Sequence, residues 1–213
     1  MRTFILAAAA ALVWPATASA VVYTVNFDTD DDGTAIAPLT VLTDQYADWG
    51  VNFLGLENGR QTDIQVGGDP DGDPQPSLPN VLTNCAPASL QCPGSRADIV
   101  RILFDAATAS VAFQVNSLGW LPITFEAYDA SNNIIETQTV ISDRGYERVS
   151  FSSGGIYRID GLQPDDFWAW TLDDLTFDIE AGPSEDVPAP AALALLGLGV
   201  GVLGLRRRRG PQG

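Results

Sequence analysis

The sequence predicts an all-β protein, an antiparallel β-sandwich, over its long middle region. Apolar and polar residues alternate there in short runs such as 21–27, and a period of two is typical of a strand with one buried face. Clusters of Asp, Asn, Gly and Pro separate the runs and indicate turns. No run has the 3.6-residue period of an amphipathic helix. Two antiparallel sheets packed face to face bury every second side chain, which accounts for the alternation.

About nine short strands follow from this pattern. We expect them at residues 21–27, 46–56, 98–105, 110–116, 123–129, 134–141, 147–152, 156–160 and 168–179. The turn composition of Ser131-Asn132-Asn133 predicts a hairpin between two of them. Residues 58–94 show little periodicity and contain many Pro, Gly and Asp residues. We expect them to form a long insertion loop, of the kind that is often functional or mobile.

The first 20 residues have the three parts of a secretory signal peptide. Arg2 begins a short basic region, residues 4–13 form an apolar core, and Ala18-Ser19-Ala20 has the small-residue pattern of a cleavage site. The sequence therefore predicts a signal peptide at 1–20, cleaved so that the mature chain begins at Val21. The β-sandwich domain would then occupy residues 21–180.

The other end of the chain predicts attachment to a membrane. A linker at 181–190 precedes an apolar helix with a basic end at 191–209, and residues 210–213 form a short tail. Residues 187–205 contain no charge and would form a helix about 28 Å long, enough to cross a hydrocarbon core. The arginines that follow are expected to stay on the cytoplasmic side. An ordinary C-terminal anchor is one interpretation.

A second interpretation comes from three features that occur in order. Val187, Pro188 and Pro190 form a Pro-rich motif, residues 195–199 are a small-residue-rich apolar run, and a basic end of Arg206, Arg207, Arg208 and Arg209 follows. This layout resembles the PEP-CTERM sorting signal, with Ala189 where the family usually has Glu. The resemblance implies processing by an exosortase-type enzyme. The protein would be exported through an inner-membrane anchored precursor to the cell surface or extracellular matrix of a Gram-negative bacterium.

Two stretches of the domain carry a further resemblance. NFDTDDDGT…LTDQYADWGVNF, residues 26–53, and WTLDDLTF, residues 170–177, resemble the start and end of jelly-roll domains that precede PEP-CTERM tails. Those domains are similar in outline to carbohydrate-binding modules. The resemblance implies one structural Ca²⁺, which acidic residues after the first strand and within the last strand would hold at one edge. The matching positions are Asp28 and Asp173, with Asp174.

The residues themselves do not decide whether a metal ion binds. Residues 28–33 have the D-x-D-x-D-G opening of an EF-hand loop, but Leu39 stands where that loop needs a bidentate Glu. Asp173 shares a face with Leu175 and Phe177, so its carboxylate would point to the core and need a partner. The alternative to calcium is that Asp173 accepts backbone N–H groups at the rim. Asp69, Asp71 and Asp73 are expected to form a solvated loop.

Charge and composition exclude several classes of function. The 27 acidic residues all lie at 21–186, where only six arginines accompany them, so that region has a net charge of −21 and repels nucleic acid. The chain has no His and no Lys, which excludes Ser-His-Asp, Cys-His and Schiff-base catalysis.

Carboxylate chemistry survives these exclusions. Glu126 with Glu136, or Asp173 with Glu147, could form an acid pair. A polysaccharide hydrolase or lyase is therefore the alternative function, although we expect a non-catalytic protein.

The aromatic residues suggest carbohydrate contact. Trp49, Trp120 and Trp168 are candidate ligand-binding residues for an exopolysaccharide, because sugar C–H faces stack on aromatic rings. Packing in the core is the alternative for each of them. The two cysteines, Cys85 and Cys92, are expected to form a disulfide that closes a small surface loop in an oxidising compartment.

Overall fold

In the computed structural model, residues 20–69, 73–86, 95–117, 122–141, 145–163 and 169–179 are described. These residues form thirteen strands and one short 3-10 helix. The elements are β1 Val21–Val25, η1 Ala47–Trp49, β2 Val51–Glu57, β3 Arg60–Thr62, β4 Gln65–Gly67, β5 Val81–Thr83, β6 Cys85–Ala86, β7 Ser95–Arg96, β8 Ile99–Ser117, β9 Ile123–Tyr128, β10 Ile134–Val140, β11 Glu147–Phe151, β12 Ile156–Leu162 and β13 Trp170–Ile179. The predicted all-β domain is confirmed.

Both predicted terminal segments lie outside the described residues, apart from Ala20. The linker at 181–190 and the helix and basic end at 191–209 therefore stay predictions, as does the signal peptide. Within the described part of the chain, no helix has the length and apolar character needed to cross a membrane.

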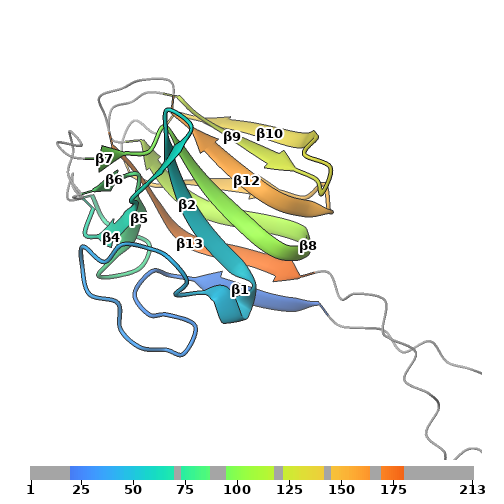
Figure 1. Cartoon of the computed structure of the whole chain (residues 1–213). Coiled ribbons are helices and arrows are strands. Elements are labelled where there is room, and N and C mark those ends of the chain that lie inside the picture. The colour runs from blue at the N-terminus through green and yellow to red at the C-terminus, as the bar shows by residue number, and fades with distance from the viewer. Residues whose placement is uncertain are drawn as a thin grey trace, which may run out of the picture. The chain divides into compact units, whose positions relative to one another are not determined.

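One long strand, β8, belongs to both layers of the sandwich (Figure 1). Residues 99–104 of β8 lie between β2 and β12. Together with β9, β10 and β3 they make the first sheet, in the order β10-β9-β12-β8-β2-β3. The second half of β8 lies between β11 and β13. This second sheet continues beyond β13 to β1 along one half of that strand, and to β5 and β4 along the other.

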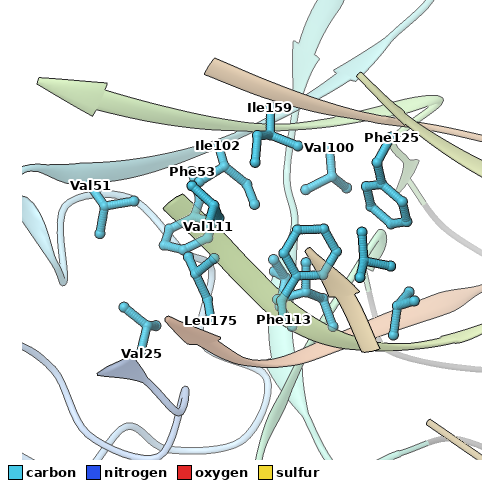
Figure 2. Close-up of a cluster of buried hydrophobic side chains, with 14 of the residues drawn as sticks. Val25, Val51, Phe53, Val100, Ile102, Val111, Phe113, Phe125, Ile159 and Leu175 are labelled. Atoms are coloured by element: carbon cyan, nitrogen blue, oxygen red, sulfur yellow. The ribbon is translucent and has the colours of Figure 1, made fainter. Parts of the chain in front are cut away.

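The core forms where the two halves of β8 face each other. Residues Val100 and Ile102 are buried in the first half, whereas Val111 and Phe113 are buried in the second, so the buried positions change from even to odd. The change coincides with a register shift in the pairing of β8 with β12. Figure 2 shows the result: side chains of the first sheet point toward those of the second across one apolar interior.

A glycine allows the two layers to approach closely beside Trp170. A Cβ atom at Gly161 of β12 would lie 2.8 Å from Phe125 and 2.9 Å from Trp170, closer than carbon atoms can approach. The Trp170 ring packs edge-on against Phe125, with the ring centroids 5.5 Å apart. The largest fully buried side chain of the domain is therefore accommodated by the absence of a side chain at Gly161.

A bulge in β13 changes the predicted orientation of Asp173. The pairing of β13 with β8 shifts register between Asp173 and Thr176, and Asp174 has a φ of +49°. Because the extra residue reverses the alternation, Leu172 and Leu175 both belong to the core. The expectation that Asp173 shares a face with Leu175 is therefore wrong. Asp173 lies on the outer side of the second sheet.

Two other strand assignments from the sequence are also wrong. The two runs expected as separate strands at 98–105 and 110–116 belong to the single strand β8, which begins at Ile99. The expected loop at 58–94 contains β3 to β6 in its described part. Asn58 and Gly59, with φ of +50° and +74°, form the two-residue turn that joins β2 to β3. An Asn-Gly pair is the strongest short-range signal of such a hairpin.

Candidate functional site

The side of the first sheet that faces away from the core carries three rows of side chains. Each row crosses the strands at one register. The leucine row consists of Gln61, Leu56, Ile99, Leu162, Thr124 and Thr139; the charged row of Leu54, Arg101, Asp160, Glu126 and Thr137; and the tyrosine row of Asn52, Leu103, Arg158, Tyr128 and Ile134. We call these three rows the outer platform. All of these side chains are half-buried or exposed except that of Asp160.

The charged row is held together by a bidentate ion pair. Arg101 Nε and Nη2 donate to the two carboxylate oxygens of Asp160 at 2.7 and 2.8 Å. Arg158 Nε lies 3.4 Å from the same carboxylate. Asp160 is only 3 % exposed, and a buried carboxylate is tolerated when it is paired in this way. The hydrogen bond to Asp160 is the main cause that raises the pKa of Arg101 above its ordinary value.

The tyrosine row extends this network. The guanidinium carbon of Arg158 lies 3.7 Å from the centre of the Tyr128 ring, a cation–π contact. Arg158 Nη1 donates to Asn132 Oδ1 at 2.6 Å, and the Tyr128 hydroxyl donates to Glu126. Burial, and then this hydrogen bond to Glu126, raise the pKa of Tyr128. The network fixes the positions of two guanidinium groups, one phenol and two carboxylates on the outward face of the first sheet.

The platform is balanced in charge although the domain is strongly acidic. Arg101 and Arg158 match Asp160 and Glu126 in number, whereas residues 21–186 have a net charge of −21. Donors and acceptors therefore lie side by side. The leucine row supplies apolar surface next to them. An arrangement of this kind suits a ligand that is uncharged, polar along its edges and apolar on its faces.

The outer side of the second sheet is different, because residues of the 69–80 segment bond to it. The Tyr146 hydroxyl donates to Asp69 at 2.7 Å, and Asn116 Nδ2 donates to Asp73 at 3.0 Å. Thr171 is fully buried there. The expectation of a solvated loop is therefore wrong for Asp69 and Asp73, while Asp71 lies outside the described residues. The outer side of this sheet is therefore covered around Thr171, Asn116 and Asp173.

The three predicted calcium ligands lie near one another but are not equivalent. Ser77 donates to Asp173 from its backbone N–H and its hydroxyl, both at 2.8 Å, and the backbone N–H of Asp174 donates to it as well. Asp173 thus holds the 73–80 segment, as in the alternative that the sequence left open. Asp28 accepts the backbone N–H of Asn80 at 2.8 Å. No three acidic or cysteine side chains within the described ranges form a group that could hold a metal ion.

Asp28 and Asp174 are two nearby carboxylates that could bind a cation. Burial, followed by the nearby charge of Asp28, raises the pKa of Asp174. The side-chain oxygen of Asn80 is buried and has no hydrogen-bond partner in the described part of the chain. Two carboxylates that repel each other and an unpaired oxygen on an adjacent residue are compatible with Ca²⁺, which takes oxygen ligands.

The predicted tryptophan site is described only at Trp49. Its half-buried ring stacks on Tyr23, with centroids 5.6 Å apart and planes at 28°, and packs against the core. This is the core-packing alternative. Trp120 and Trp168 lie outside the described residues.

The predicted disulfide is described at one of its two cysteines. Cys85 is disulfide-bonded. Cys92, the sequence's other cysteine, lies outside the described residues.

Neither carboxylate pair drawn from the sequence comes together. Glu126 pairs with Thr137 on the platform, whereas Glu136 stands at the next register and points to the opposite face, where it accepts the N–H groups of Ser152 and Ser153. Asp173 and Glu147 likewise stand opposite adjacent residues of β8, and therefore on opposite faces.

Sequence reasoning missed the residues that make the platform. Arg101, Tyr128, Arg158 and Asp160 come from three strands, and no motif joins them. Their only sequence signal is a polar residue at alternate positions in strands with apolar neighbours, which indicates an outward face but not which strands lie side by side.

Comparisons with known proteins give no family. No family model and no curated protein sequence matches the chain. Among solved structures, the K2 cleaved adhesin domain of Lys-gingipain is 10 % identical, with 74 % of this chain and 99 % of that domain covered and a TM-score of 0.46. The K1 domain of Lys-gingipain from Porphyromonas gingivalis W83 is 11 % identical (74 % and 97 % covered, TM-score 0.45). A family 29 carbohydrate-binding module from Piromyces equi is 10 % identical (76 % and 92 % covered, TM-score 0.41). The fold assignment rests on the strand pairings above.

The environment of Asp173 predicts a pH dependence of stability. Burial raises its pKa from the ordinary 3.8 to about 6 in the folded protein, so the folded state binds this proton more tightly than the unfolded state. The contribution to stability is complete below about pH 4 and is lost as the pH rises toward 6. Asp173→Asn should remove this loss, which amounts to at most about 3 kcal/mol.

Urea unfolding between pH 3.5 and 7 measures the effect. The exposed Asp63→Asn is the matched control and should follow the native chain. An Asp173→Asn variant with the same pH profile as the native chain would contradict the assignment.

Proposed function

We propose that this chain is an exported, non-catalytic surface or extracellular-matrix protein that binds a polysaccharide on the outer platform. One observation carries the proposal: the first sheet presents fixed, charge-balanced donors and acceptors beside an apolar row. Arg101 is hydrogen-bonded to Asp160 at 2.7 Å, and Arg158 lies between the Tyr128 ring and the same carboxylate, 3.4 Å from it, so a ligand meets groups that lose little conformational freedom on binding.

The chemistry of these groups matches that of a sugar. Each sugar hydroxyl donates and accepts a hydrogen bond, so a surface that binds several of them needs both kinds of partner. Thr124 and Thr139, whose hydroxyls lie 3.2 Å apart, add further donor–acceptor groups. Leu162 and its apolar neighbours in the leucine row supply contact for the C–H faces of the ring. The acidic surroundings favour a neutral polymer over a polyanion.

The same groups support binding without catalysis. Acid–base hydrolysis needs two carboxyl groups that flank one bond and are available to it. Asp160 is covered by two guanidinium groups, and Glu126 accepts the Tyr128 hydroxyl. We therefore propose that the platform holds its ligand unchanged.

Variants of the platform test this proposal. Thr124→Ala removes a hydroxyl from the leucine row, and Glu126→Gln replaces one carboxylate oxygen of the charged row by an amide NH2 donor. Both changes keep Arg101 and Asp160, which form the ion pair. Binding of the full chain to immobilised neutral hexasaccharides (cellohexaose, laminarihexaose, mannohexaose) should weaken at least about tenfold, equivalent to about 1.4 kcal/mol. Ser150→Ala, on an exposed position of β11, is the control and should bind like the native chain.

Two results would contradict the proposal. Absence of binding to every neutral glycan would remove the binding function. Release of new reducing ends from any of these glycans would favour the hydrolase alternative, and release of unsaturated products would favour a lyase.

We also propose that the tail sorts the protein. The Pro-rich motif, apolar run and basic end from Val187 to Arg209 support processing by an exosortase-type enzyme, which would cut the chain after its export. The cut would remove the basic end and release the domain from the membrane.

Mass spectrometry of the mature protein tests this processing and should find a C-terminus before Arg206. Replacement of Pro188 and Pro190 by Ala should leave the tail uncut, because it removes the motif that the enzyme would recognise. Replacement of Pro183 and Pro211 by Ala changes two prolines outside the motif and is the matched control. An intact basic end on the mature native protein would exclude this processing.

Finally, we propose one structural Ca²⁺ near Asp28 and Asp174, with the Asn80 side-chain oxygen as a further ligand. A bound cation would relieve the repulsion between the two carboxylates and stabilise the folded state by RT ln(1 + c/Kd), where c is the free Ca²⁺ concentration. Millimolar Ca²⁺ should raise the midpoint of thermal unfolding by several degrees, and Asp174→Asn should abolish the increase. Asp44→Asn is the control. A native protein whose unfolding is unaffected by Ca²⁺ and by a chelator would rule the site out.

A further inference from the structure

The tip of the β2–β3 hairpin forms a polar pocket at the edge of the first sheet. Its volume is about 510 Å³, and its lining includes Glu57, Asn58, Arg60 and Gln61. This volume lies within the range of small-molecule sites in proteins. Gln61 also stands opposite Leu56 in the pairing of β3 with β2. The pocket therefore meets the end of the leucine row at Gln61, whereas Glu57 and Arg60 pair at the next register and project from the other side of the hairpin.

The hairpin is tied to the start of β8. The backbone N–H of Asn58 donates to Asp98 Oδ2 at 2.7 Å, and Arg96 Nη2 lies 2.6 Å from the other oxygen of the same carboxylate. Asn58 and Gly59 hold the left-handed conformation that a two-residue hairpin turn requires. These contacts fix the backbone of the pocket, so its lining side chains start from a defined position.

The lining residues supply both kinds of hydrogen-bond partner. Glu57 accepts, Arg60 donates, and the two amides of Asn58 and Gln61 do both. The charges of Glu57 and Arg60 cancel. In the described part of the chain, none of the lining residues has an apolar side chain. Such a pocket suits a compact polyhydroxyl group. It offers little to an apolar ligand, and its balanced charges favour neither an anion nor a cation.

We infer that this pocket holds a single sugar residue at one end of a neutral oligosaccharide that lies along the leucine row. The inference rests on the proposed function and extends it to the recognition of a chain end. The row crosses six strands from β3 to β10, a span of about 24 Å at the usual strand spacing. A glycan on the platform thus reaches the pocket, and the pocket lies at the edge strand, where the row stops.

Calorimetric titration of the full chain with cellohexaose, laminarihexaose and mannohexaose tests the inference. Arg60→Ala with Glu57→Gln changes two lining residues that are not part of the platform and should weaken binding about tenfold. Its effect and that of Glu126→Gln on the platform should multiply when the two are combined, because one ligand spans two separate subsites. Arg148→Ala, at an exposed position of β11 in the second sheet, is the control for loss of a surface charge and should bind normally.

A second probe separates this inference from the proposed function. Saturation-transfer NMR with glucose, mannose and galactose should detect one of these sugars on the native chain, and Arg60→Ala with Glu57→Gln should abolish that signal. If hexasaccharides bind but the pocket variant binds them like the native chain, the pocket inference is wrong and the platform stands. If a monosaccharide gives the signal but no hexasaccharide binds, the pocket stands and the platform is wrong. If neither ligand binds, both are wrong.

Discussion

The fold depends on β8, a single strand that takes part in two sheets. Its first half is the centre of one layer and its second half the centre of the other. The change of buried positions between Phe104 and Val111 lets both halves point their apolar side chains at the same interior. Because every row of the platform passes through β8, the register of this one strand also decides which polar residues of β2 and β12 lie on either side of it.

The Arg101–Asp160 pair illustrates how a sheet can carry charge on its outer side without losing stability. Removing Asp160 from water costs several kcal/mol in general, and two hydrogen bonds from one guanidinium offset that cost because they are charge-assisted. The second guanidinium, from Arg158, is held by the Tyr128 ring as well as by Asp160. The pair therefore fixes the orientation of the Arg101 side chain more than it stabilises the fold. The remaining N–H groups of Arg101 stay at the surface and point in one direction.

How much the sequence could predict depended on the range of the interaction. Alternation along each strand is local, and it identified the β-sandwich and most of its strands. The Asn58-Gly59 hairpin was also a local signal, although it was hidden in a stretch that looked like loop. The orientation of Asp173 was not predictable by counting, because one bulged residue at Asp174 reverses every side chain beyond it. The platform was beyond reach as well, since pairing between distant strands sets its rows and alternation says nothing of which strands pair.

The pairing of β1 with β13 has a mechanical consequence. Val21 stands opposite Ile179, so the domain's first and last strands leave it side by side. Residues 175–179 of β13 are hydrogen-bonded to β1 on one side, and most of them also to β8 on the other. A force that acts between a ligand held on the first sheet and the residue after Ile179 would load those ladders along their length. All of their hydrogen bonds would then have to break together, whereas a strand pulled sideways would lose them one at a time.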